Sequence, residues 1–234
     1  MTALTETDPE FAAFFTAFTT DESLTDNALP TSDRYLYQLG ALIAVGADAP
    51  FRNQLAAALD ADVTPVQVKE VVYQAAAYAG GARAIAFLEV TNEILASRGV
   101  TLPLPGQSTT APEDRMALGT AKQKEAVGGD NVDGMYANAT PDTLRFQRFL
   151  SGNCFGDYYT RAGLDLRQRE LLTFAILVGL GGADNQVKGH VAANLNVGNT
   201  RAHLLDVLAA LVSWVGYPRT LNGLAAVNDG APAD

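Results

Sequence analysis

The sequence has few of the residues on which redox and metal chemistry depend. Its 234 residues include one cysteine, Cys154, and only two histidines. One thiol cannot form an internal disulfide, and such a chain is typical of a reducing cytoplasm. One thiol and two imidazoles also cannot supply the four ligands of a Cys/His metal site. We therefore expect a cytoplasmic protein without such a metal site.

Positive charge and long apolar runs are scarce as well. Lys and Arg number 16 against 26 Asp and Glu, so the net charge is −10 at pH 7. Phosphate backbones repel a chain of this charge, which argues against nucleic-acid binding. No apolar run reaches the ~18 residues of a membrane span. The first residues carry acids where a secretory signal carries bases, so we expect neither membrane insertion nor export.

Apolar residues are plentiful, and they recur at helical spacing. They make up 48% of the chain, enough for a sizeable core. Sustained strand alternation is missing, so the predicted fold class is all-α. Thr64, Asp165, Asp184 and Thr200 are expected to cap helices, and Gly198 lies where a left-handed residue ends one.

One stretch of the chain lacks periodicity. Residues 97–115 contain three prolines and no helical pattern. This predicts an N-terminal domain over residues 1–98, a linker over 99–115 and a C-terminal domain over 116–234.

The sequence contains an internal repeat. A shift of 136 positions lays residues 34–88 over residues 170–224 without a gap, and capping residues, glycine breaks and apolar rows coincide. This pattern indicates a duplicated helical unit. The copies differ where the first has Arg34, Arg52 and Gln54 and the second has Glu170, Lys188 and His190. These differences are either drift in a structural copy or a sign that only the second copy keeps chemistry.

Glu170 and His190 are the candidate catalytic residues. His190 lies on the flank of an apolar helical stripe, where a half-buried imidazole can exchange protons near neutral pH. Glu170 lies at the start of the most apolar helix, where burial would suit it to proton transfer. Two plainer interpretations stand beside these: an ordinary hydrogen-bonded histidine, and a carboxylate that complements the helix dipole or pairs with Arg167 or Arg169.

Local charge indicates an anionic ligand. Residues 161–219 carry six basic and four acidic side chains, although the whole chain is acidic. Solvated helix faces could give the same count. Lys188 and Arg219 are the predicted carboxylate-binding residues. Trp214 and Tyr217 either line the pocket or belong to the core.

Cys154 and His203 are predicted to have structural roles. Cys154 has no adjacent histidine and is predicted to be a packed thiol. His203 is the third residue after Thr200, which predicts a capping role.

Residues 161–224 resemble the γ-carboxymuconolactone decarboxylase family of the alkylhydroperoxidase D-like superfamily. The resemblance is carried by GLD-x-R-x-R, an apolar helix, the motif histidine and a closing W-x-G-x-P. Residues 34–88 resemble the same unit more weakly. The resemblance implies an alkylhydroperoxidase D-like helical bundle that assembles as rings of small subunits. A chain with two fused copies is expected to form a homo-oligomer, namely a trimer.

The resemblance also assigns roles to residues. Peroxidase members carry a C-x-x-C at the positions held here by Ala183 and Gln186. His190 matches the motif histidine, and Glu170 matches the glutamate of related members. Decarboxylase members often have acidic residues just before the histidine, where this chain has Asn185 and Gln186.

Together these features predict a cofactor-independent decarboxylase that acts on a small carboxylated lactone or related anion. Lys188 or Arg219 would hold the carboxylate, and His190 with Glu170 would deliver the proton. One alternative is a non-catalytic or binding scaffold, because the first copy shows that the unit can exist without the histidine. Another is an alkylhydroperoxidase-type antioxidant protein, which the missing cysteines disfavour.

Overall fold

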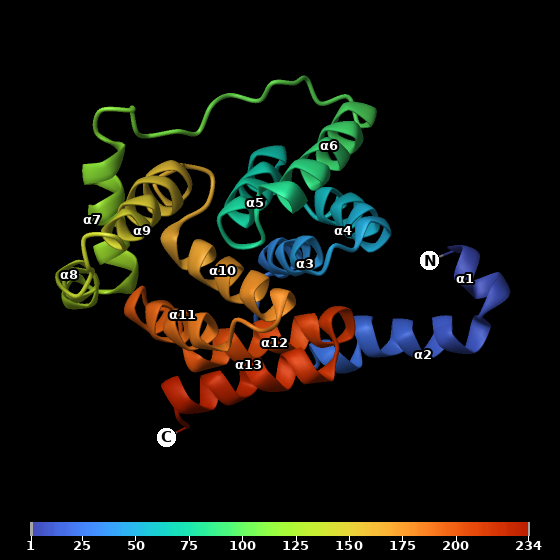
Figure 1. Cartoon of the computed structure of the whole chain (residues 1–234). Helices are drawn as coiled ribbons and strands as arrows, with labels where there is room; N and C mark the ends of the chain where they lie inside the picture. Colours follow the sequence, from blue (N-terminus) through green and yellow to red (C-terminus); the bar gives the residue numbers. More distant parts are fainter. Residues whose placement is uncertain (1, 234) are drawn as a thin grey trace.

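The computed structural model describes residues 2–233, and all its regular elements in that range are helices. The all-α prediction is confirmed. The chain begins with α1 (Thr2–Thr7), α2 (Pro9–Thr20) and a short 3₁₀ turn (Glu22–Leu24). In Figure 1, α2 projects from the side of the molecule and carries α1 at its outer end. No helix in this range is long and apolar enough to cross a membrane.

Two sets of four helices follow the predicted repeat. The first set is α3 (Thr31–Val45), α4 (Asp48–Asp60), α5 (Pro65–Tyr78) and α6 (Gly81–Ser97). The second set is α10 (Leu166–Leu180), α11 (Asp184–Asn196), α12 (Arg201–Val215) and α13 (Tyr217–Gly230). Adding 136 to the bounds of α4 gives the bounds of α11. The duplicated helical unit is therefore confirmed.

The two repeats share one hydrophobic core. Helices α3 and α10 pack against each other at its centre. Small residues permit the close approach: a Cβ on Gly40 would lie 2.5 Å from the Leu172 side chain, and one on Gly179 would lie 2.9 Å from the Ala41 carbonyl oxygen. Buried residues of both repeats belong to one apolar cluster. The two repeats therefore pack as one body. The division into two domains stays a prediction from the sequence.

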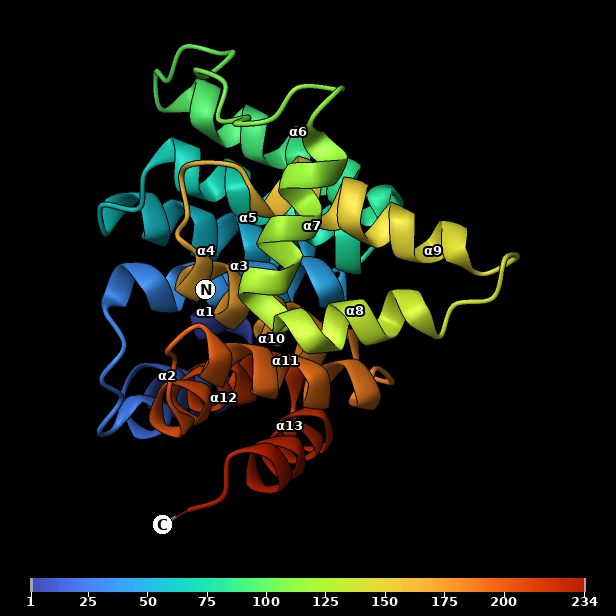
Figure 2. The ribbon, with the colours of Figure 1, turned by 90° about the vertical axis from the view of Figure 1, so that its left-hand side faces the viewer.

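A third group of helices connects the repeats. Residues 98–114 run without a helix across one edge of the molecule (Figure 1) and lead into α7 (Arg115–Val127). Helices α8 (Gly129–Ala137) and α9 (Leu144–Phe149) follow, and α9 continues directly into a π-helical segment, η2 (Leu150–Tyr159). Seen from the side in Figure 2, α8 and α9 extend away from the two repeats. Segment η2 packs against α7 and also contacts α5, which brings it to the site described below.

Helix capping follows the sequence closely, with one exception. The side chains of Thr64, Asp165 and Thr200 each accept a hydrogen bond from the backbone N–H three residues later and complete a capping box. The expectation for Asp184 is wrong, because Ala183 occupies the capping position and Asp184 is the first helical residue without a side-chain cap bond. At that position its carboxylate complements the helix dipole instead.

Candidate active site

Glu170 and His190 lie side by side in the folded chain. The His190 Nδ1 is 2.7 Å from the Glu170 Oε2, and the exposed fractions of the two side chains are 14% and 0%. The capping box at Asp165 sets the start of α10 and so the position of Glu170 one turn into it. An ionised carboxylate accepts, so Nδ1 donates and Nε2 is left as the basic nitrogen of a neutral ring. The pair can thus hold or release one proton at Nε2.

Asn194 fixes the two helices that carry the pair. Its amide nitrogen donates to the backbone oxygen of His190 at 2.7 Å and to that of Glu170 at 3.1 Å. Its amide oxygen accepts from Asn199 at 2.8 Å, and Asn194 is fully buried. Asn194 was not among the predicted site residues. A buried asparagine among apolar residues is the signal that could have found it, since it needs several partners.

One tyrosine packs on the imidazole, and a second tyrosine is hydrogen-bonded to the first. The Tyr78 ring meets the His190 ring edge to face, with centroids 5.7 Å apart. The Tyr78 hydroxyl donates to that of Tyr159 at 3.0 Å, and Tyr159 lies 2.6 Å from the Thr173 hydroxyl. Burial raises the pKa of both tyrosines well above the usual value, and the Glu170 carboxylate adds to the effect. Both therefore stay protonated and act as neutral hydrogen-bonding groups.

These tyrosines were not among the predicted site residues. Tyr78 belongs to the last turn of α5 in the first repeat, and Tyr159 ends η2 in the connecting segment. Neither lies near Glu170 or His190 in sequence, and no local spacing links them to the pair. The contact of η2 with α5 and the hydrogen bond of Tyr159 to Thr173 on α10 bring them together.

One oxygen of the site has no protein partner. The Glu170 Oε1 is buried and accepts no hydrogen bond from any residue in 2–233. A buried carboxylate oxygen that lost its water without a replacement would cost free energy. A proton or a donor group of a bound molecule would satisfy it. The unpaired oxygen is therefore a buried acceptor beside the imidazole, and the imidazole is the more exposed member of the pair.

Cys154 is a packed thiol, as predicted. It is 6% exposed and lies 3.5 Å from the Tyr78 hydroxyl. Burial raises the pKa of its thiol to about 12. The thiolate, which is the reactive form, is therefore absent at neutral pH.

We expect Cys154 to resist modification in the native protein. A thiol reagent such as 5,5′-dithiobis(2-nitrobenzoate) should release less than about a tenth of one equivalent of chromophore at pH 7, because both burial and protonation slow the reaction. In guanidinium chloride the same thiol should react fully. Rapid stoichiometric reaction of the folded protein would contradict this assignment. It would make a thiol-dependent activity a candidate function again.

Lys188 does not lie beside the acid–base pair. Its ammonium pairs with Asp229 at 2.7 Å on the surface, where the two side chains are 55% and 64% exposed. Residues two apart on a helix point to opposite sides. Lys188 therefore faces away from the side of α11 that carries His190.

Arg219 and Trp214 also lie elsewhere within the chain. Arg219 donates to the carbonyl of Gly179 at 2.6 Å, and nine residues of α10 separate that carbonyl from Glu170, about 13 Å along the axis. Trp214 packs edge to face on Phe15 at 5.7 Å. The predicted substrate-binding residues and the predicted catalytic residues thus occupy different places in one chain.

The remaining predicted residues have structural positions. Tyr217 is 62% exposed, so the expectation of a core aromatic is wrong for it. His203 accepts from the Thr200 backbone N–H at 3.1 Å, which confirms its capping role. No three histidine, cysteine or carboxylate side chains within 2–233 gather as metal ligands.

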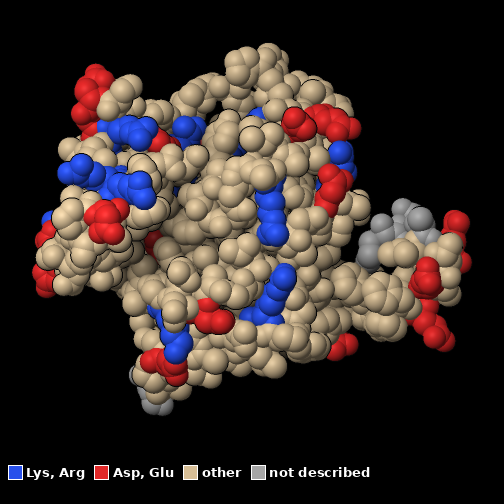
Figure 3. Space-filling view, viewed as in Figure 1, with Lys and Arg blue, Asp and Glu red and all other residues tan. Residues whose placement is uncertain are grey.

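The cations of residues 161–219 do not form one patch. Arg169 is buried against Glu70, Lys188 pairs with Asp229, and Arg201 donates to the carbonyl of Ala231. On the face drawn in Figure 3, blue and red side chains are scattered among uncharged ones. The local excess of positive charge therefore reflects several separate contacts.

Comparison with known proteins agrees with this architecture. The model of the carboxymuconolactone decarboxylase family matches the chain twice, at residues 9–93 and 145–229, again 136 positions apart. A 4-carboxymuconolactone decarboxylase of Acinetobacter baylyi is 29% identical over 106 residues, which cover 45% of this chain and 78% of that protein. A nitrosuccinic acid decarboxylase of Metarhizium robertsii is 26% identical over 106 residues, covering 45% and 73%. The chain belongs to the carboxymuconolactone decarboxylase family.

Proposed function

We propose that this protein is a cofactor-independent decarboxylase of a small anionic lactone or carboxylate, with His190 and Glu170 as its acid–base pair. The observation that carries the proposal is the 2.7 Å contact between the His190 Nδ1 and the Glu170 Oε2 at a partly exposed imidazole. The similarity to two decarboxylases supports the reaction class.

In the proposed reaction the pair delivers one proton to the substrate. When the carbon–carbon bond to a carboxylate breaks, carbon dioxide leaves and the electron pair stays on the substrate as an enolate. His190, protonated at Nε2, donates its proton to the carbon of that enolate. Glu170 holds the ring through Nδ1 and stabilises its charged form. Solvent then returns a proton to Nε2, so the cycle consumes one proton and releases one carbon dioxide.

We propose that Lys188 or Arg219 binds the substrate carboxylate and that Trp214 contacts the substrate. In one chain these residues lie away from the pair, as described above. We therefore propose that these residues contribute to the acid–base site of a second copy of the chain.

The first repeat lacks the corresponding pair. Gln54 occupies the position of His190, and Arg34, at the position of Glu170, donates to the Thr31 hydroxyl at 3.4 Å. We therefore assign catalysis to the second repeat and a supporting role to the first, which supplies Tyr78.

The proposed reaction can be tested directly. Purified protein is incubated with γ-carboxymuconolactone and, separately, with nitrosuccinic acid, and carbon dioxide release is measured. We expect turnover of at least one carboxylated compound of this class. Binding of such compounds without any carbon dioxide release would favour the scaffold alternative. Peroxide consumption coupled to a dithiol would favour the antioxidant one.

We further propose that the protein is a homo-oligomer, namely a trimer. Helix α2 projects from the body (Figure 1), and its Phe11 and Phe14 are 45% and 62% exposed. Large exposed aromatics on one helix favour burial against another copy. Light scattering after size-exclusion chromatography should give about three times the chain mass. A chain mass that persists at high protein concentration would contradict the proposal.

A further inference from the structure

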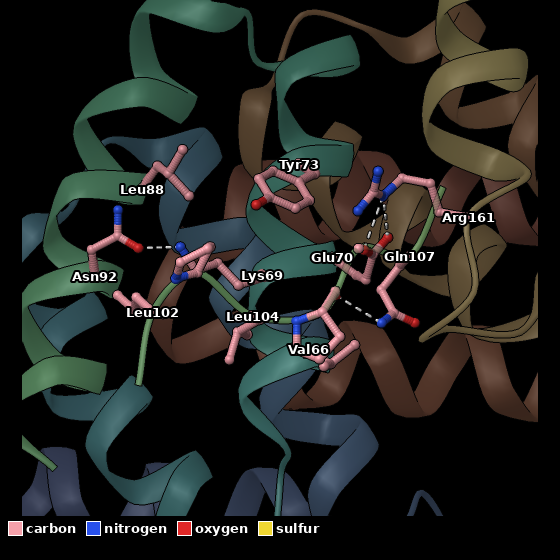
Figure 4. Close-up of a pocket in the computed structure, with 13 residues that line it drawn as sticks. Val66, Lys69, Glu70, Tyr73, Leu88, Asn92, Leu102, Leu104, Gln107 and Arg161 are labelled. Carbon is pink, nitrogen blue, oxygen red and sulfur yellow. Dashed lines mark hydrogen bonds and ion pairs between the residues drawn. The ribbon is translucent and has the colours of Figure 1, made fainter. Parts of the chain in front are cut away.

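A polar cavity lies in the first repeat, away from His190. It has a volume of about 420 Å³ and is enclosed by α5, α6, the start of the loop before α10 and the non-helical connection. Its apolar walls come from six side chains: Val66, Leu88, Leu102, Pro103, Leu104 and Pro105. Its polar groups are those of Lys69, Glu70, Asn92, Gln107 and Arg161, with Tyr73 between the two cations in Figure 4. A few polar groups on apolar walls are typical of a small-molecule site.

Lys69 is a buried cation without a counterion. The residue is 8% exposed, and its ammonium donates to the Asn92 side-chain oxygen (Figure 4). Among residues 2–233 it forms no ion pair, and burial lowers the pKa of its ammonium. Buried charges are ordinarily paired. This one faces a cavity.

Positive charge exceeds negative charge around the cavity. Glu70 is its single carboxylate, and it is held by Arg161 through Nε at 2.9 Å and by Arg169 at 2.9 Å. Arg161 lies over the Tyr73 ring, 4.9 Å from its centroid, and its two terminal nitrogens have no hydrogen-bond partner in the described part of the chain. Three cations against one carboxylate leave two positive charges, at Lys69 and at Arg161.

The connection between the repeats creates this cavity. Residues Leu102–Gln107 pass over it, and the Ala162 N–H donates to the Gln107 carbonyl at 3.0 Å. At the positions of Lys69 and Tyr73 the second repeat has Leu205 and Ala209. The lysine and the tyrosine of the cavity thus belong to the first repeat and are not repeated at the equivalent positions of the second.

We propose that this cavity binds a small organic dicarboxylate, with one carboxylate on the Lys69 ammonium and the other on the terminal nitrogens of Arg161. A dianion neutralises the two uncompensated charges, and its carbon chain lies against Tyr73 and the leucines. Lys69 is nine residues, about 13 Å, from Tyr78 on the same helix. The cavity is therefore a site separate from the proposed catalytic pair.

Calorimetric titration with adipate, a dicarboxylate, tests the proposal. Hexanoate is the control ligand, because it has the same number of carbons but one carboxylate. We expect adipate to bind the wild-type protein at least tenfold more tightly than hexanoate. Lys69→Leu, which installs the residue of the second repeat, should weaken adipate binding at least tenfold. Lys122→Leu removes a lysine that pairs with Glu125 on the surface and should leave binding unchanged.

Further variants separate this site from the catalytic one. His190→Gln should leave adipate binding intact. If it abolishes binding while Lys69→Leu does not, the dianion sits at the acid–base pair and the cavity proposal is overturned. The proposal would also be overturned if the wild-type protein bound hexanoate as tightly as adipate. Absence of adipate binding to the wild type at adipate concentrations of about 10 mM would overturn it as well. If Lys69→Leu loses its helical circular dichroism, Lys69→Gln, which keeps a donor for Asn92, replaces it under the same criteria.

Discussion

Replacing His190 by glutamine lowers kcat for decarboxylation by about 10²- to 10⁴-fold, the usual contribution of a general acid or base. Glutamine can fill the position and form hydrogen bonds, but it cannot deliver a proton near neutral pH. The first repeat carries Gln54 at the equivalent place in α4, so the unit tolerates this residue. Steady-state carbon dioxide release gives kcat, and far-ultraviolet circular dichroism checks that helicity is unchanged.

The chain supplies a matched control for this experiment in its other histidine. His203→Gln places a glutamine three residues after Thr200, and the first repeat has the same arrangement in Gln67 after Thr64. Both versions complete a capping box. We therefore expect His203→Gln to keep wild-type kcat and melting temperature. Equal activity in the two glutamine variants would remove His190 from the mechanism.

The sequence predicted the two site residues that lie on neighbouring helices, α10 and α11. Glu170 and His190 lie on consecutive helices of one repeat, and the resemblance marked both. Lys188 was expected to bind the substrate carboxylate because positive charge is locally in excess. An offset of two residues on a helix instead places it on the opposite side, against Asp229.

The remainder of the site depends on contacts that no local pattern encodes. Tyr78 reaches His190 from the other repeat, and Tyr159 reaches Thr173 from the connecting segment. The cavity at Lys69 exists because residues 102–107 cross α5 and α6. Such contacts follow from how the helices pack, whereas capping boxes follow from residues three positions apart.

The same limit applies to Arg169, whose partner could not be read from the sequence. Its guanidinium was considered as a partner for Glu170. It instead crosses to the first repeat, where it donates to Glu70 at 2.9 Å and to the Gln74 side-chain oxygen at 2.9 Å. Arg169 and Glu70 are each 1% exposed. The ion pair therefore joins the two repeats in a region that water does not reach.

Replacing Glu70 by leucine destabilises the protein by about 3–5 kcal/mol, because it leaves Arg169 buried without its counterion. For a chain of this size the melting temperature should fall by about 6–20 °C. Arg161, whose side chain is 18% exposed, can turn toward water, so most of the cost falls on Arg169. Chemical denaturation in urea measures the free energy of unfolding. The control is Asp229→Leu at the exposed pair with Lys188, where water screens the charges and the loss should be much smaller than for Glu70→Leu.

Combining Glu70→Leu with Arg169→Met should recover much of that loss, because the double variant has no buried charge left unpaired at this position. The two single changes and their combination form a thermodynamic cycle whose coupling free energy reports the interaction between the residues. We expect the double variant to be more stable than Glu70→Leu alone. Additive losses would show that packing, and not charge, is what Glu70 contributes. The link between the repeats would then rest on the apolar contact of α3 with α10, which both single variants leave in place.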